Sequence, residues 1–433
     1  MRADPFSSVK SVTKKPYNFD VIIAGAGPAG SSAAIHLAGG GLRVLLVEQK
    51  QFPRAKLCGE FISPECRRHF DNLGVSDAML SAGPSAITET VFYSTRGHHV
   101  TIPSRWFGGP AALGLSRAVM DNLLLRRAQE CGVNVLEGAS INEPIIDGNN
   151  VLGVKIKIDG HEHDYRAPLT IDATGRARIL TRKLNTSEHR SRATLIAFKA
   201  HLRNTRVAHN ACEIYFYPEG YGGLSTIEGE ISNLCFIISA EQVRRHHSDP
   251  QMVMREMVMK NRRAAYTLAH AEAESEWLSA SWERFGPQRP NPARGLLAIG
   301  DAAAFIDPFT GSGMLMAFES GELAATVILR YREKLASQES LAALGAEYTA
   351  AHFGTFDSRL RISGLLRRAA FKPRLAGIGI ALCGISEQLR NRLVRSTRST
   401  NEVRLLGARC LGTALAKAPT SRRTPRSRPN LRS

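Results

Sequence analysis

The stretch that decides the fold reads Phe19-Asp20-Val21-Ile22-Ile23-Ala24-Gly25-Ala26-Gly27-Pro28-Ala29-Gly30. It predicts a short buried strand that ends in the pattern Gly-x-Gly-x-x-Gly, and residues 31–38 continue as a helix. A second apolar strand follows at residues 44–47 and ends in Glu48. This order of strand, glycine turn, helix, strand and acid predicts a βαβ unit that binds a dinucleotide.

Each residue of this pattern has its own expected part in nucleotide binding. Gly25 permits the tight turn, Gly27 lets the backbone approach a pyrophosphate, and Gly30 lets the helix pack closely on the strand. The free N–H groups at the helix start favour the phosphates electrostatically. Glu48 lies at the spacing where a carboxylate accepts hydrogen bonds from a ribose.

Composition and cysteine usage restrict the class of protein. The 433 residues suffice for two or three domains, and 43% hydrophobic with 22% charged residues is typical of a soluble globular chain. The seven cysteines form no Cys-x-x-Cys pair, which predicts a reduced, cytoplasmic protein without disulfides. We expect no metal site, because the histidine pairs at residues 98–99 and 246–247 lack a third ligand at metal spacing. The first eighteen residues contain no apolar signal segment.

The net charge of +18 is concentrated in the last part of the chain. Residues 358–433 hold 18 Lys and Arg but only two acids, so the remaining chain is almost neutral. This asymmetry predicts a basic appendage and argues against a nucleic-acid partner. Two alternatives stay open for its helices: their apolar stripes pack on the body, or they make peripheral contact with an anionic membrane.

The chain divides into segments that differ in their pattern of hydrophobic and polar residues. We expect an α/β fold in which a Rossmann-like nucleotide-binding domain carries an inserted α+β substrate domain and a C-terminal helical segment. The expected ranges are 1–18 for a flexible lead-in; 19–84, 113–192 and 286–337 for the discontinuous nucleotide-binding domain; 85–112 and 193–285 for the β-rich domain; 338–418 for a basic helical segment; and 419–433 for a disordered basic tail. Within the third block, residues 295–301 predict a strand and residues 313–334 a long helix.

Two more glycine turns follow predicted strands far along the chain. The first is Ile171-Asp172-Ala173-Thr174-Gly175-Arg176; the second is Gly300-Asp301-Ala302-Ala303, continued by Asp307-Pro308-Phe309-Thr310-Gly311-Ser312-Gly313. An acid at a strand end can bind a ribityl hydroxyl, and amides at a helix start can stabilise the negative charge of a reduced flavin. A nicotinamide enzyme has no need of this second site, so the pattern favours a flavin nucleotide.

Together the three motifs resemble the fingerprints of FAD-dependent oxidoreductases that share the glutathione-reductase-type FAD fold. Their order is similar to that of para-hydroxybenzoate-hydroxylase-like monooxygenases, flavin-dependent halogenases and geranylgeranyl reductases. The resemblance covers roughly residues 18–350 and implies FAD as cofactor, with NAD(P)H as its transient reductant. It implies these site residues: Gly25, Gly27 and Gly30 at the pyrophosphate, Glu48 at the adenosine ribose, Arg117 at the phosphates, Asp301 at the ribityl chain, and Pro308, Gly311 and Gly313 along the isoalloxazine ring.

Several departures from the usual family motifs bear on which branch of this superfamily the chain resembles. Aromatic hydroxylases usually carry Asn after the last glycine, where this chain has Met314. Halogenases usually carry Trp-x-Trp-x-Ile-Pro, whereas Trp277 and Trp282 have another spacing. Residues 56–64 resemble the Cys-Gly-(Asp/Glu) loop of geranylgeranyl-reductase-like proteins. Residues 217–223 resemble their Pro-x-Gly-Tyr-Gly segment, but the Trp-containing continuation of true prenyl reductases is absent.

These observations favour an NAD(P)H-dependent monooxygenase that hydroxylates a hydrophobic aromatic or polyketide-like small molecule with O₂. The alternatives are a geranylgeranyl-reductase-like enzyme that reduces C=C bonds of an isoprenoid lipid, and a non-catalytic flavin-binding scaffold. Three residues are catalytic candidates: Lys56 could polarise an oxygen, Cys58 could be redox-active, and Tyr221 could face the substrate. Each residue also has a purely structural interpretation: Lys56 as a solvated loop cation, Cys58 as a small packing residue and Tyr221 as an ordinary strand aromatic.

Overall fold

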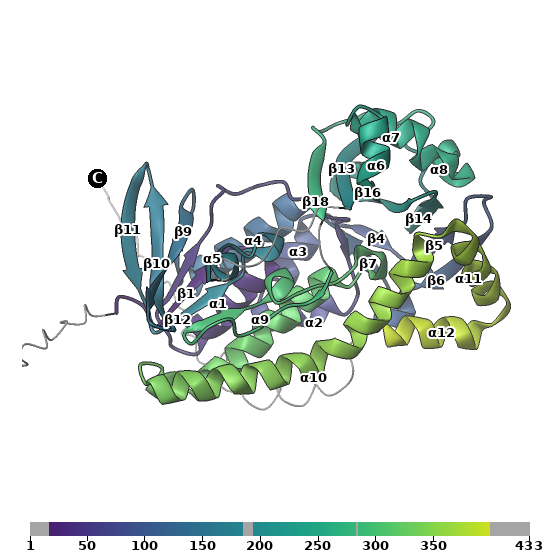
Figure 1. Ribbon diagram of the computed structural model, residues 1–433. Coiled ribbons are helices and arrows are strands. Elements are labelled where there is room, and N and C mark those ends of the chain that lie inside the picture. Colours follow the sequence, from purple (N-terminus) through teal and green to yellow (C-terminus); the bar gives the residue numbers. More distant parts are fainter. Residues whose placement is uncertain (1–16, 185–193, 283–284, 399–433) are drawn as a thin grey trace, which may run out of the picture.

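The computed structural model describes residues 17–184, 194–282 and 285–398, so the predicted basic tail and nearly all of the lead-in lie outside the described residues. A parallel sheet with the strand order β20-β12-β1-β2-β8 forms the centre of the molecule (Figure 1). Its strands are β1 (Val21–Ala24), β2 (Val44–Val47), β8 (Asn134–Leu136), β12 (Leu169–Asp172) and β20 (Leu296–Ala298). This Rossmann-like sheet confirms the predicted α/β class.

Strand β1 is buried on both faces, which explains its unbroken apolar sequence. Val21 and Ile23 pack among helices, while Ile22 and Ala24 pack against a small antiparallel sheet. The helices on the first face include α1 (Pro28–Gly39), α4 (Arg117–Glu130) and α9 (Gly313–Arg330). The antiparallel sheet comprises β9 (Ser140–Asp147), β10 (Asn150–Ile158) and β11 (His161–Arg166), with α5 (Ile179–Leu184) beside it.

The third predicted block differs from expectation at two points. Strand β20 ends at Ala298, and Gly300–Ala302 form a 3₁₀ turn, because Gly300 adopts a φ of +58° that a strand cannot continue. The predicted helix over residues 313–334 ends at Arg330. Tyr331 has a φ of −103° and a ψ of 6°, outside the helical region, and a separate 3₁₀ turn follows at Arg332–Lys334.

A second, larger sheet lies beside the parallel one and joins segments that are distant in the sequence. Its strands are β5 (Glu89–Tyr93), β6 (His99–Pro103), β13 (Leu195–Arg203), β14 (Ala211–Tyr217), β15 (Gly220–Thr226), β16 (Ser232–Ser239), β17 (Glu272–Ala273) and β18 (Leu278–Trp282). Three short helices cover its outer face: α6 (Ala240–Arg245), α7 (Pro250–Glu256) and α8 (Arg262–Thr267). The opposite face, with Phe216, Tyr221 and Ile237, turns inward.

Short elements connect the two sheets. They are the helices α2 (Cys66–Leu73) and α3 (Ser76–Ser81), the three-stranded sheet of β3 (Phe61–Ile62), β7 (Ala112–Gly114) and β4 (Ser85–Ile87), and the pair β19 (Gly286–Pro287) and β21 (Ala304–Phe305).

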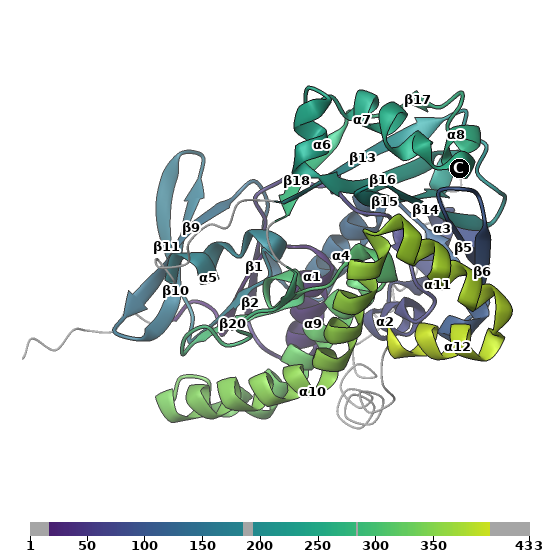
Figure 2. The same cartoon turned by 45° about the vertical axis from the view of Figure 1, so that its right-hand side comes forward.

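The C-terminal helices bridge both parts of the molecule. They are α10 (Gln338–Ala370), α11 (Pro373–Ile385) and α12 (Glu387–Ser396). Helix α10 packs on α9 through the buried ion pair of Arg359 with Glu319, whose atoms lie 2.8 Å apart. Figures 1 and 2 show α10 running from the parallel sheet to the second sheet, where α11 and α12 fold back. None of the helices in the described ranges is long and apolar enough to cross a bilayer.

Candidate functional site

The first glycine turn is shaped by contacts within the chain and opens on a cavity. Gly25 has a φ of +101°, and a Cβ there would lie 2.5 Å from the carbonyl oxygen of Ala173. A Cβ on Gly30 would lie 1.9 Å from the carbonyl oxygen of Gly25, so the protein itself requires both glycines. Gly27, at the start of α1, differs: a Cβ there would meet only Arg117 Nη2, at 3.9 Å. The side of Gly27 on which a Cβ would lie faces the cavity, as a pyrophosphate-binding position requires.

Two acids organise the charges around this turn. Glu48, at the end of β2, accepts hydrogen bonds from the backbone N–H groups of Ala26 (3.1 Å) and Lys50 (3.0 Å). Arg54 Nη2 also lies 3.5 Å from Oε2 of Glu48, while Oε1 keeps a further lone pair that a ribose hydroxyl could use. Asp121 accepts hydrogen bonds from Arg117 at 2.7 and 2.8 Å and from Arg54 at 3.0 Å, which directs both guanidinium groups to one wall of the cavity.

The third motif closes the other end of the same cavity. Burial raises the pKa of Asp301, and the charges of Arg176 and Arg117 oppose this only in part. Among the described residues, none donates a hydrogen bond to the Asp301 carboxylate, which leaves it available for ribityl hydroxyls. Gly311 adopts a φ of +62°, and Gly313 begins α9, whose first N–H groups lie at the cavity. A partly buried acid that accepts no hydrogen bond from the described residues, beside a helix start, fits the ribityl chain and ring of a flavin.

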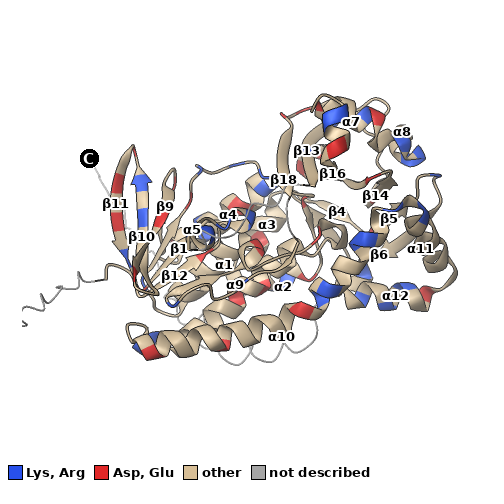
Figure 3. Ribbon diagram, in the orientation of Figure 1, with Lys and Arg blue, Asp and Glu red and all other residues tan. Residues whose placement is uncertain are grey.

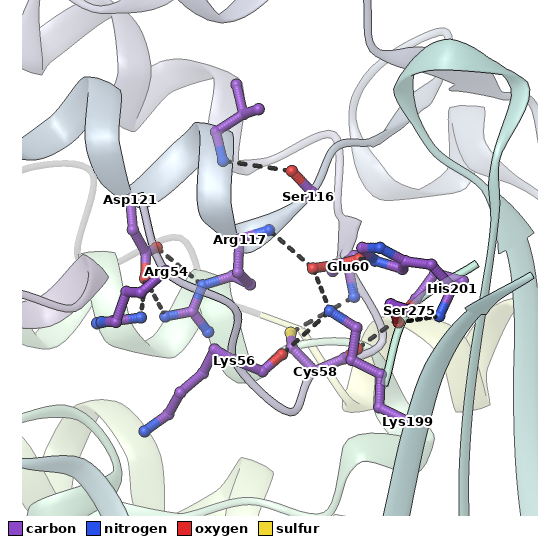
Figure 4. Close-up of polar contacts among 12 residues, drawn as sticks. Arg54, Lys56, Cys58, Glu60, Ser116, Arg117, Asp121, Lys199, His201 and Ser275 are labelled. Carbon is purple, nitrogen blue, oxygen red and sulfur yellow. Dashed lines mark hydrogen bonds and ion pairs between the residues drawn. The ribbon is translucent and has the colours of Figure 1, made fainter. Parts of the chain in front are cut away.

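The Lys56–Glu60 loop is held by a buried charge cluster (Figure 4). Glu60 accepts hydrogen bonds from Lys199 Nζ at 2.5 Å, from His201 Nε2 at 2.7 Å and from the backbone N–H of Arg117 at 2.8 Å. Burial raises the pKa of Glu60, but the hydrogen bond from His201 and the charge of Lys199 outweigh it, so the pKa lies below its usual value. Lys199 also donates to the carbonyl oxygen of Lys56 at 3.1 Å, which fixes the loop's other end.

Lys199 and His201 were not among the residues predicted from the sequence. Their signal was available, because a lysine inside the otherwise apolar Phe198-Lys199-Ala200 run needs a buried partner. Lys56 lines the cavity, and its side chain remains exposed. Partial burial between the cavity walls and the charges of Arg117, Arg54 and Arg176 lower its pKa.

Tyr221 forms an acid–base pair with a residue that was not among the predicted candidates, Asp307. The Tyr221 hydroxyl donates to Asp307 Oδ1, and the backbone N–H of Phe309 donates to both side chains, at 3.1 and 2.9 Å. Burial raises the pKa of Asp307 to about 6, although the Tyr221 hydrogen bond lowers it in part. Asp307 Oδ2 accepts no hydrogen bond from any described residue, and Arg367 Nε of α10 lies 3.7 Å away.

One cavity of about 910 Å³ connects these features. The predicted residues Gly25, Gly27, Glu48, Lys56, Cys58, Arg117, Tyr221, Asp301, Pro308, Gly311 and Gly313 all line it. Gly30 lies behind it, in the contact of α1 with the first turn. Beyond the third motif the walls are apolar: Phe92, Phe216 and Ile237 come from the second sheet, and Ala370, Ile380 and Leu393 come from α10, α11 and α12. The site therefore pairs a polar nucleotide half with an apolar half.

Fold and cavity together define a flavin-nucleotide-binding protein of the oxidoreductase class. Residues 18–347 match the model of the FAD binding domain family, so the chain belongs to that family of FAD-dependent proteins. Among the described residues, the structure contains no cluster of three His, Cys, Asp or Glu groups suited to a metal.

Relatives within the family differ in what their names say they do. A 1H-pyrrole-2-carbonyl-[peptidyl-carrier protein] brominase of Pseudoalteromonas luteoviolacea is 28% identical over 72% of this chain and 77% of its own. A digeranylgeranylglycerophospholipid reductase of Methanococcoides burtonii is 27% identical over 71% of this chain and 74% of its own. The solved flavin-dependent brominase Bmp2 matches with a TM-score of 0.72 at 23% identity, over 89% of this chain and 95% of that one. The family is therefore clear, while the reaction has to be argued from the site.

Proposed function

We propose that the chain is an FAD-dependent monooxygenase that hydroxylates an apolar, phenol-bearing small molecule. The Tyr221–Asp307 pair carries this proposal, because it offers a proton acceptor at the boundary between the nucleotide half and the apolar half of the cavity. Bound FAD, reduced by NAD(P)H, would supply the activation of O₂, with one oxygen atom going to the substrate and the other leaving as water. The apolar walls would bind the substrate and exclude water.

The chain's own residues would prepare the substrate for oxygen transfer. The Tyr221 hydroxyl would accept the phenolic proton while passing its own proton to Asp307, which leaves the aromatic ring electron-rich. Arg367, 3.7 Å from the carboxylate, would favour the ionised form of Asp307 before the transfer.

The activity should rise with pH through about 6, where Asp307 loses its proton. Only the ionised carboxylate can accept a proton through Tyr221, so the protonated form below this pH is inactive. The measurement is the pH dependence of kcat with saturating nonylphenol and NADPH. A kcat that falls as the pH rises through 6 would contradict the assigned direction of proton transfer.

A Tyr221→Phe variant should lose about 10²- to 10⁴-fold in kcat, the usual contribution of a positioned acid or base. Its affinity for FAD should be unchanged, and the pH step near 6 should disappear with the hydroxyl. Tyr217→Phe is the matched control, since the Tyr217 hydroxyl donates to the carbonyl oxygens of Tyr221 and Ile237 and lies outside the cavity lining. Equal kcat losses in both variants would assign Tyr221 a packing role only.

A second candidate, reduction of an isoprenoid C=C bond, is favoured by the same pair working in the opposite direction. Protonated Asp307 would resupply Tyr221, which would donate a proton to one carbon of the double bond. Bound, reduced FAD would supply the hydride needed at the other carbon. This reaction would become slower as the pH rises through about 6. Incubation with nonylphenol, geranylgeraniol and bromide separates the reactions: an added oxygen atom from labelled O₂ supports the proposal, and a saturated or a brominated product overturns it.

A further inference from the structure

Exposed apolar side chains concentrate on the C-terminal helices. Eleven large apolar residues are exposed among those the structure describes, and six of them fall between residues 365 and 389. These six are Leu365, Leu375, Ile378, Leu382, Ile385 and Leu389. We call them the apolar ridge. Such a concentration of exposed apolar side chains is uncommon on a soluble protein and indicates a contact surface.

Helix α11 is apolar on two faces, and only one of them has a partner in the described chain. Ala376 and Ile380 are buried and line the cavity. On the other side, Ile378, Leu382 and Ile385 recur at i, i+4 and i+7, which places them in one stripe. The exposed Leu375 also lines the cavity and lies at the border between the two faces. Ile385 is 85% exposed, the largest value in the ridge. No residue in the described ranges therefore covers this second face.

Exposed cations border this ridge on both sides. Figure 3 shows Lys and Arg at the end of α10 and along α12. The exposed members are Arg368, Lys372, Arg374, Arg392 and Arg395, together with Arg361, which pairs with Asp357 at 2.6 Å. Glu387 is the only acid in the sequence between residues 358 and 398. A second copy of this chain would bring two cationic borders together, so like charges argue against the ridge as a dimer contact.

We propose that the ridge docks on an anionic lipid bilayer. The stripe of α11 would lie among the lipid headgroups, with the bordering cations on the lipid phosphates, as in other interfacial helices. Because the opposite face of α11 lines the cavity, the docked helix separates the bilayer from the site by its own width. Entry of an apolar substrate from the bilayer at this point rests on the proposed function, whereas docking itself does not.

The test is co-sedimentation of the full-length, FAD-loaded protein with vesicles. We expect binding to phosphatidylcholine vesicles that contain phosphatidylglycerol, weakening at high salt, and little binding to phosphatidylcholine alone. A triple variant, Ile378→Ser, Leu382→Ser and Ile385→Ser, should bind at least about tenfold more weakly. The control is Ile146→Ser with Met252→Ser, two exposed apolar residues elsewhere, which should bind as the unaltered protein does.

Three results would overturn the proposal. They are no binding to anionic vesicles, unchanged binding of the triple variant, or a dimer of the unaltered protein that the triple variant dissociates. The last would assign the ridge to a second copy. Because none of these measurements involves turnover, a failure of docking is distinct from a failure of the proposed hydroxylation, and NADPH oxidation with nonylphenol reports the latter separately.

Discussion

A Gly27→Val variant should fold like the unaltered chain and yet be isolated without its yellow cofactor. A Cβ at this position meets only the end of the Arg117 side chain at 3.9 Å, so the apoprotein has room for it. The added atoms occupy the side of the turn where the pyrophosphate must approach the backbone. We expect the FAD affinity to fall by roughly 100-fold or more, the upper range of an overpacking cost of about 1–3 kcal/mol.

The measurement is quenching of FAD fluorescence by apoprotein, with the thermal unfolding of both apoproteins compared alongside. Gly30→Ala is the informative contrast, because its Cβ would lie 1.9 Å from the carbonyl oxygen of Gly25. That variant should fail to fold, because the added Cβ clashes with the backbone of the protein itself. Full FAD affinity in folded Gly27→Val protein would place the pyrophosphate elsewhere.

Replacing Lys199 by methionine should lower the free energy of unfolding by about 3–5 kcal/mol, the usual loss when one member of a buried ion pair is removed. Lys199 and Glu60 are almost fully buried, and the substitution leaves Glu60 with His201 as its remaining side-chain partner. Chemical denaturation at pH 7 gives the value. The exposed Lys157→Met on β10 is the control and should change it by less than about 0.5 kcal/mol.

The pKa of Glu60 determines how the stability loss of the Lys199→Met variant depends on pH. Its pKa in the folded chain is lowered, so its stabilising contribution is complete above the unfolded value of about 4.3 and disappears as the pH falls through the folded value. Lys199→Met should therefore cost less at acid pH than at pH 7. A cost below about 1 kcal/mol at pH 7 would show that the cluster is not a structural unit.

The nucleotide half of the site could be predicted because its signals are local. The spacing of Gly25, Gly27 and Gly30 after a strand determines a turn whatever surrounds it, and Glu48 follows at the end of the next strand. The structure brings the third motif, with Asp301 and Gly313, to the same cavity.

The other half depends on tertiary contacts that no local pattern contains. Asp307 was visible within a motif, but its pairing with Tyr221 joins residues 86 positions apart. The side-chain partners of Glu60, Lys199 and His201, are more than 130 positions away. The C-terminal helices were expected either on the body or on a membrane, and α11 has a buried face on the cavity together with a bare face outside. A sequence periodicity predicts a single apolar face for each helix. It therefore offers contact with the body and contact with a membrane as alternatives, although one helix can have a face for each.

The most direct test of the proposed hydroxylation is rapid mixing of the anaerobically reduced, FAD-loaded protein with O₂, followed by absorbance. The expected result is a transient spectrum, distinct from those of reduced and oxidised flavin, that persists before reoxidation and decays faster in the presence of nonylphenol. Direct reoxidation without any transient, combined with anaerobic reoxidation by geranylgeraniol, would contradict the account and assign the cavity to the reduction of C=C bonds.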